Sequence, residues 1–183
     1  MEKNVAQIAL FAALIAALGL VPPITLPFGI PVTAQSMGVM LTGAILGARR
    51  GFLSVMLFLL LVAIGLPLLS GGRGGLAAFT APTSGFLIAF PVAAYVTGLF
   101  VEHIALRPIA LRAALGAVLG GIVVMYAFGI IGMSIGLGKS IPECLLLVTA
   151  FLPGDLLKAG VTGMLVSAIA KARPQSVAWS LNV

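Results

Sequence analysis

An acidic and a basic residue stand three positions apart inside an otherwise apolar stretch, Pro153-Gly154-Asp155-Leu156-Leu157-Lys158. Ionised side chains are costly in membrane-grade sequence and usually serve a function. On a helix over 156–170 with Asp155 as its N-cap, both side chains project from one face. The pair is therefore the leading candidate for holding a polar ligand. The alternative is an ion pair that satisfies itself across one helical turn.

A second candidate is a loop that surrounds one arginine with four glycines, Gly71-Gly72-Arg73-Gly74-Gly75. The loop does not have the glycine spacing of a nucleotide-binding turn, and no predicted strand precedes it. It could bring backbone N–H groups and the planar guanidinium onto a carboxylate. The alternative is an interfacial arginine that meets lipid headgroups.

Two other segments resemble nucleotide-binding or catalytic motifs but lack the residues or the flanking structure that those motifs require. Gly138-Lys139-Ser140 ends like an ATP-binding loop, but Met133 stands where that motif requires its first glycine. The segment 132–136 fits G-x-S-x-G, yet no strand leads into it, and His103 is predicted at the opposite membrane face. A single histidine also rules out a histidine-based metal cluster. We therefore expect no catalytic residue, no metal and no cofactor.

The composition is that of a membrane protein. Of 183 residues, 61% are hydrophobic and only 8% are charged, and the mean hydropathy is +1.26. Soluble domains have about 25% charged residues. The net charge of +6 does not indicate nucleic-acid binding, because the basic residues lie at the ends of apolar runs instead of forming a patch with aromatics. We expect one membrane domain over 1–183, with the lipid bilayer as its surroundings.

Six apolar stretches are long enough to cross a bilayer, which takes about 17 to 25 residues or slightly fewer with tilt. The second and third must form a hairpin with Arg49 and Arg50 at its tip. With that tip in the cytoplasm, only Arg73 and Lys139 among the loop cations lie outside, as the positive-inside rule requires, and both termini are cytoplasmic. The fold class is therefore all-α integral membrane. The predicted spans are 5–21, 33–48, 51–69, 85–101, 113–135 and 155–170.

The predicted outer connections, 22–31 and 70–85, are long and rich in glycine and proline. Irregular backbone near a membrane persists only where it packs on protein or lines a cavity. Asp155 and Lys158 fall at the outer end of the last span. We therefore expect these two loops to cover the charged pair.

Four segments together match one known family. They are Pro31-Val32-Thr33-Ala34-Gln35, the hairpin 43–51, the glycine-rich loop that leads into Ala81-Pro82-Thr83-Ser84-Gly85, and Pro153 to Ala159. In these segments the chain resembles the BioY family, the biotin-specific S components of energy-coupling factor (ECF) transporters, and the resemblance spans essentially the whole chain. Ala81 departs from the glycine expected there.

The resemblance implies a six-helix S-component fold with an outward-facing vitamin site, in a multi-pass protein of the bacterial plasma membrane. It also implies partnership with a transmembrane coupling subunit and two cytoplasmic ATPases. The coupling subunit would dock on a stripe of small residues on the first span, here Ala9, Ala13 and Ala17, which allows close helix approach. The alternative for that stripe is packing within this chain.

The resemblance further implies that Asp155 and Lys158 contact biotin. Its ureido ring has two N–H groups that need an acceptor and a carbonyl that needs a donor, and the rest of the molecule needs apolar walls. The alternatives are an S component for another small vitamin and, less favoured, an intramembrane enzyme. The candidate substrate-binding residues are Asp155, Lys158, Arg73, Gly74, Phe79, Pro82, Thr83 and Gln35.

Overall fold

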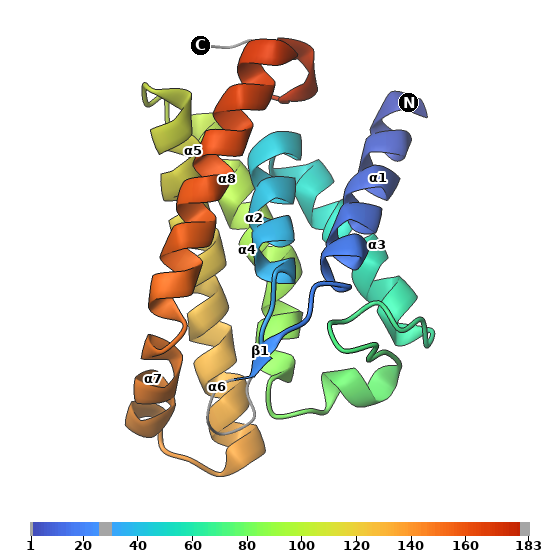
Figure 1. Cartoon of the computed structure of the whole chain (residues 1–183), viewed down its shortest axis with the longest axis vertical. Helices are drawn as coiled ribbons and strands as arrows, with labels where there is room; N and C mark the ends of the chain where they lie inside the picture. The colour runs from blue at the N-terminus through green and yellow to red at the C-terminus, as the bar shows by residue number, and fades with distance from the viewer. Residues whose placement is uncertain (1, 26–30, 180–183) are drawn as a thin grey trace.

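A computed structural model describes residues 2–25 and 31–179 as a bundle of helices that run along one long axis (Figure 1). Two short strands, β1 (Ile24–Thr25) and β2 (Pro31–Val32), pair antiparallel at one end. Residues 26–30 of the predicted loop 22–31, and residues 180–183, lie outside the described part of the chain. The helices are α1 (Glu2–Leu18), α2 (Gln35–Leu46), α3 (Ala48–Ala63), η1 (Leu76–Phe79), α4 (Ser84–His103), α5 (Ile109–Val118), η2 (Leu119–Val124), α6 (Met125–Leu137), α7 (Ile141–Thr149), α8 (Leu152–Ala172) and η3 (Pro174–Ser176).

The predicted all-helical architecture is confirmed, although the helix bounds differ from the predicted spans. Three helical stretches are long and apolar enough to cross a membrane, Ser84–His103, Ile109–Leu137 and Leu152–Ala172. Helices α1 and α3 have 17 and 16 residues. Helix α2 has only 12 residues, which rise about 18 Å against a hydrocarbon core of about 30 Å.

The short helix α2 lies inside the bundle, where it packs against α1, α3, α4, α5 and α8. Every residue from Gly38 to Leu46 is buried. A helix that is covered by its neighbours does not need to match the thickness of the bilayer with its own length. Both ends of α2 therefore contact other parts of the protein. Its N-terminal end contributes to the pocket described below.

The predicted hairpin between α2 and α3 forms around one residue, Gly47. Its φ of 80° lies in the left-handed region that favours glycine. A Cβ at this position would collide with the carboxylate of Glu102. That carboxylate accepts a hydrogen bond from the Ala48 N–H at 3.0 Å, and the Arg50 Nε donates to the Leu46 carbonyl at 3.1 Å. The turn is thus fixed by both backbone geometry and side chains.

The segment that follows α8 folds back onto the same end of the bundle. Trp179 is buried, and its Nε1 donates to the Ala44 carbonyl at 2.7 Å. The Ala178 N–H donates to the Ile45 carbonyl at 3.0 Å. The guanidinium carbon of Arg112 lies 4.3 Å from the centre of the Trp179 ring. The tail therefore satisfies carbonyls in the last turn of α2 that have no partner within the helix.

Helix α8 begins earlier than predicted, so the prediction that Asp155 is its N-cap is wrong. The helix starts at Leu152 with Phe151 as the N-cap residue. Pro153 lies in the first turn, where its missing N–H removes no helical hydrogen bond. The Asp155 N–H already donates to the Phe151 carbonyl at 2.9 Å. Asp155 is therefore a first-turn residue whose side chain is free to face the bundle interior.

Helix α7 was not predicted, because nine residues are too few to register as a membrane span. It begins with a capping box in which the Ser140 hydroxyl and N–H both donate to Glu143. The hydrogen bond from the Ser140 hydroxyl lowers the pKa of the Glu143 carboxyl most, and the one from the Ser140 N–H lowers it further. Cys144 and Val148 on its inner face pack against Met133 of α6.

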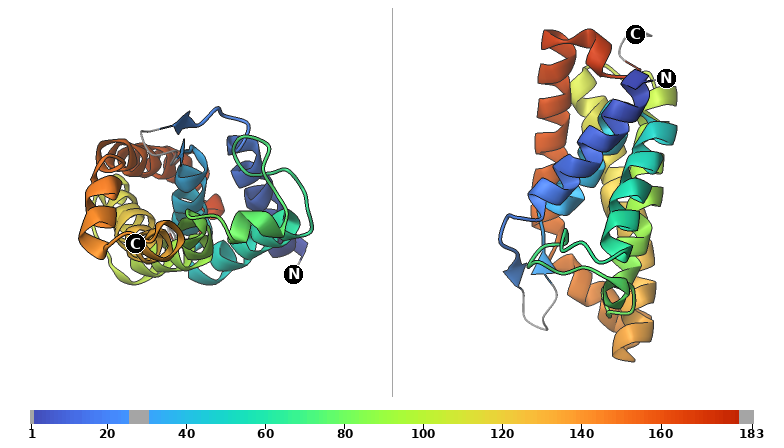
Figure 2. Two further views of the ribbon diagram at one scale, coloured as in Figure 1. Left: turned by 90° about the horizontal axis from the view of Figure 1, so that it is seen from below. Right: turned by 90° about the vertical axis from the view of Figure 1, so that its right-hand side faces the viewer.

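The longer connections gather at one end of the molecule. The first residues of α1 and the last turn of α8 are both at the opposite end, whereas β1, β2, the 64–83 connection and α7 lie at this one (Figures 1 and 2). This agrees with the expectation that the glycine- and proline-rich loops share one side of the protein with the start of the last helix.

Candidate ligand-binding site

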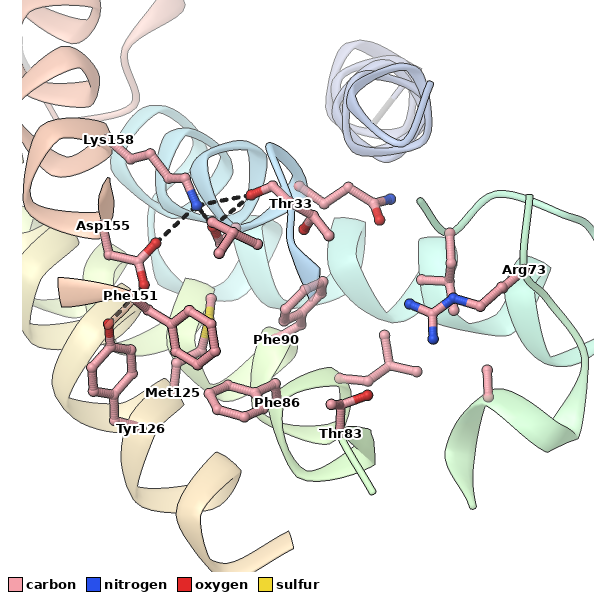
Figure 3. Close-up of a pocket in the computed structure, with 16 residues that line it drawn as sticks. Thr33, Arg73, Thr83, Phe86, Phe90, Met125, Tyr126, Phe151, Asp155 and Lys158 are labelled. Carbon is pink, nitrogen blue, oxygen red and sulfur yellow. Dashed lines mark hydrogen bonds and ion pairs between the residues drawn. The ribbon is translucent and has the colours of Figure 1, made fainter. Parts of the chain in front are cut away.

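A pocket lies at the end of the bundle where the longer connections gather (Figure 3). Its walls come from β2 and the first turn of α2, from the loop that contains Arg73, and from α4, α6 and the start of α8. The lining residues are Val32, Thr33, Gln35, Ser36, Leu69, Arg73, Ala78, Thr83, Phe86, Leu87, Phe90, Met125, Tyr126, Phe151, Asp155 and Lys158.

The predicted charged pair forms the polar end of this pocket. Lys158 Nζ donates to Asp155 Oδ1 at 2.8 Å, and the Asp155 and Lys158 side chains are only 9% and 16% exposed. The ammonium also donates to the Thr33 carbonyl at 2.8 Å and to Ser36 Oγ at 2.9 Å. An ammonium has three protons, so all three are used. The pair is thus tied to the first turn of α2 as well as to itself.

Tyr126 completes the charged end and was missed in the sequence. Its hydroxyl donates to Asp155 Oδ2 at 2.9 Å, so each carboxylate oxygen has one partner. Tyr126 is the second residue of α6 and so lies just after η2, a π-helical turn that shifts the face presented by the next residues. A phenol inside an apolar span needs a hydrogen-bond partner, which is a usable signal. The sequence does not say, however, which polar group 29 positions away supplies it.

Apolar side chains line the pocket beyond its charged end. Phe86 packs edge-to-face against Tyr126 and Phe151, with ring centres 6.4 and 6.3 Å away. Phe90 and Met125 lie beside it (Figure 3). None of these side chains was singled out in the sequence, because aromatic and methionine residues in apolar spans are ordinary there.

Arg73 stands at the other end of the pocket, across the aromatic side chains from Asp155 and Lys158, and its guanidinium points inward (Figure 3). Its Nε donates to the Ser70 carbonyl at 3.3 Å. No other hydrogen bond of this guanidinium is formed within residues 2–25 and 31–179. The pocket is therefore an apolar slot with a carboxylate–ammonium pair at one end and a guanidinium at the other.

The remaining predicted site residues divide into two groups. Thr83 and Gln35 line the pocket with the three charged residues, whereas Gly74, Phe79 and Pro82 do not. Gly74 lies against the backbone of Leu66. Phe79 packs onto the core formed by α1, α3 and α4, and Pro82 is exposed.

The predicted docking stripe lies on the outside of the bundle. Ala9, Ala13 and Ala17 are exposed along α1, whereas Ala12 and Ile15 on its other face are buried. In the described part of the chain, no group of three or more His, Cys, Asp or Glu side chains could hold a metal ion.

These features define a class of protein, an all-helical membrane protein with a pocket that is apolar in its middle and polar at both ends. The fold is that of a solved S component. The crystal structure described as the S-component for biotin from an ECF-type ABC transporter matches with a TM-score of 0.87 and 32% identity, over 92% of this chain and 91% of that one. Within that class, the chain belongs to the BioY family, whose profile matches residues 2–175.

Relatives agree over nearly the full length. The chain is 54% identical over 186 residues to the biotin transporter BioY of Rhodobacter capsulatus, covering 97% of this chain and 98% of that protein. It is 47% identical over 178 residues to the biotin transporter BioY of Rhizobium etli, covering 94% and 95%. Because the family and these relatives are transport proteins, the chain is a transport protein and not an intramembrane enzyme.

Proposed function

We propose that this protein binds biotin with high affinity and takes it up as the biotin-specific S component of an ECF-type transporter. The observation that carries the proposal is the order of groups along the pocket. Asp155 and Lys158 lie at one end, aromatic side chains line the middle, and Arg73 lies at the far end. Biotin has a ureido ring, an apolar thiophane ring with a valeryl chain, and a carboxylate in the same order.

The charged end suits the ureido ring in hydrogen-bonding capacity. The Asp155 carboxylate has about four lone-pair sites and uses one on Lys158 and one on Tyr126. It therefore has acceptors left for the two ureido N–H groups. The Lys158 ammonium has no proton left, so a ligand carbonyl must displace Thr33 or Ser36. Ligand capture consequently exchanges one of the hydrogen bonds that Lys158 makes at the edge of the pocket.

Arg73 is assigned to the biotin carboxylate, since its guanidinium fork suits that group. Arg73→Ala should weaken biotin binding by about tenfold to a hundredfold, the range for a lost hydrogen bond to a charged group. Biotin methyl ester should bind this variant and the unchanged protein with similar affinity. Isothermal titration of both ligands measures the difference.

Lys139→Ala provides the matched control, because it removes another loop cation that does not line the pocket. If Arg73→Ala leaves biotin affinity unchanged, or weakens the acid and the ester equally, the carboxylate is held elsewhere.

Tyr126→Phe tests the position of the Asp155 carboxylate. Removing the hydroxyl takes one of two hydrogen bonds from that carboxylate, so we expect biotin affinity to fall by roughly tenfold. Tyr95→Phe is the control, because Tyr95 packs edge-to-face on Phe52 away from the pocket. Equal biotin affinities of the two variants would show that the Tyr126 hydroxyl does not position the Asp155 carboxylate for the ligand.

The membrane arrangement is proposed as follows. The chain crosses the bacterial plasma membrane six times with both termini in the cytoplasm, and the pocket faces outward. The end of the bundle that carries the start of α1 also carries Arg49, Arg50, Lys171 and Arg173, as the positive-inside rule favours. A transmembrane coupling subunit and two cytoplasmic ATPases power the uptake. The coupling subunit docks on Ala9, Ala13 and Ala17, whose exposure on α1 supports this role.

Uptake of labelled biotin by bacterial cells without a transporter of their own tests the transport role. Cells that express this protein together with a coupling subunit and both ATPases should accumulate biotin, and Asp155→Asn should abolish the accumulation. Failure of the complete set to accumulate biotin, with all subunits present in the membrane, would contradict the proposal.

A further inference from the structure

Gln35 lines the pocket, but its carboxamide is fully used by the protein. The side chain is 2% exposed. Its Nε2 donates to the Ile15 carbonyl at 3.1 Å and to the Leu68 carbonyl at 3.0 Å. Its Oε1 accepts a hydrogen bond from the Ser70 N–H at 3.0 Å. Both donors and the acceptor therefore hold backbone groups of two other segments, the last turns of α1 and the connection after α3.

Neighbouring contacts make this junction tight. A Cβ on Gly19 would lie 3.0 Å from Gln35 Nε2 and would collide with the Leu68 carbonyl. The Ser70 hydroxyl donates to the Val21 carbonyl at 3.2 Å. The end of α1, the start of α2 and the 68–70 segment are thus joined at one buried point. Buried polar groups that are all satisfied fix a single geometry.

The junction continues directly to Arg73. Ser70, which Gln35 holds by its N–H, accepts the hydrogen bond from Arg73 Nε through its carbonyl. Backbone hydrogen bonds between Leu69 and Arg73, at 2.9 and 3.2 Å, close the turn between them. Moving the 68–70 segment therefore moves the guanidinium.

The next residue of α2 reaches the opposite end of the pocket. Ser36 Oγ accepts a hydrogen bond from Lys158 Nζ. The adjacent residues Gln35 and Ser36 therefore connect the first turn of α2 to the Arg73 loop on one side and to the charged pair on the other. The separation of the two polar ends of the pocket therefore depends on the position of this one turn.

We propose that Gln35 is a positioning residue that sets the span between the Asp155–Lys158 pair and Arg73, and so selects ligands by the length of the chain between ring and carboxylate. This takes the place of the expectation that Gln35 touches the ligand. The inference rests on the proposed function in one respect, namely that the ligand carboxylate meets Arg73. The junction itself is independent of any ligand.

Ligand length provides the functional test. Norbiotin and homobiotin have one methylene fewer and one more than biotin, and the unchanged protein should prefer biotin to both. Gln35→Met keeps the length of the side chain and removes all three hydrogen bonds. We expect it to weaken biotin binding by about tenfold and to bring the affinity ratios of biotin to its two homologues close to one.

Gln7→Met is the matched control, because Gln7 accepts a hydrogen bond from Arg50 at 2.9 Å at the other end of the bundle. It should leave both ratios unchanged. If Gln35→Met does not fold, Gln35→Glu replaces it, since that variant keeps the acceptor for Ser70 and loses both donors. Ratios that remain at their original values in the folded variant would overturn the proposal, even if biotin binds more weakly.

A labelling experiment tests the junction without ligand. Ser70→Cys places a thiol at a position that is 2% exposed, and the native Cys144 is fully buried. A charged maleimide should label the introduced thiol slowly in the presence of Gln35 and about tenfold faster after Gln35→Met. An unchanged rate would show that Gln35 does not hold the loop, and would overturn the inference. If biotin fails to bind the unchanged protein, the proposed function fails, and the labelling result still decides the role of Gln35 in holding the loop.

Discussion

Asp155→Asn is expected to weaken biotin binding by about two to three orders of magnitude. In the proposed site the substitution replaces the anionic acceptor of both ureido N–H groups with a neutral amide. Two hydrogen bonds to a charged acceptor contribute about 3 kcal/mol or more together, which corresponds to at least about two orders of magnitude in affinity. Equilibrium binding of labelled biotin to purified protein measures the loss.

A control variant distinguishes the loss of biotin affinity from damage to the fold. Glu143→Gln removes an exposed carboxylate that does not line the pocket, and should leave affinity unchanged. If Asp155 and Lys158 form only a self-satisfied ion pair, Asp155→Asn lowers the thermal stability while biotin binds as before. A folded Asp155→Asn protein with unchanged affinity would therefore reject the assignment of this pair to the ligand.

Ala13→Trp is expected to abolish co-purification with the coupling subunit while biotin affinity stays the same. Lipid is as apolar as leucine, so membrane helices associate through close packing and not through hydrophobic burial. A bulky indole in the centre of the exposed stripe formed by Ala9, Ala13 and Ala17 should hold the two surfaces apart. The residue does not line the pocket, so binding and coupling should separate.

Met164→Trp is the control for added bulk, because Met164 is also exposed but lies on α8, away from the stripe. It should still co-purify with the coupling subunit. If Ala13→Trp co-purifies normally but binds biotin poorly, the stripe packs within this chain and the docking surface lies on another helix.

The charged residues of the site could be predicted because each is out of place in its surroundings. Asp155 and Lys158 interrupt an apolar run, and Arg73 is isolated among glycines. Their convergence followed from alternating the spans across a membrane, since this put the glycine-rich loop and the start of the last helix on one side.

The rest of the site depends on contacts that spacing does not reveal. Tyr126 reaches Asp155 just after a π-helical turn, which changes the direction in which the following side chains point. A regular helical repeat does not predict that change. The start of α8 was misplaced because Pro153 and Gly154 were interpreted as a break, whereas a first turn tolerates proline. The partners of Gln35 are backbone groups 20 to 35 positions away. Sequence alone cannot tell such an internal role from contact with a ligand.

The most direct test of the proposed function is equilibrium binding of a panel of labelled water-soluble vitamins to the detergent-purified protein. Biotin should bind in a one-to-one ratio, and no other vitamin of the panel should displace it at a hundredfold excess, a margin of about 2.7 kcal/mol. If biotin does not bind, or if another vitamin displaces it at equal concentration, the pocket serves a different ligand and the proposed function is contradicted.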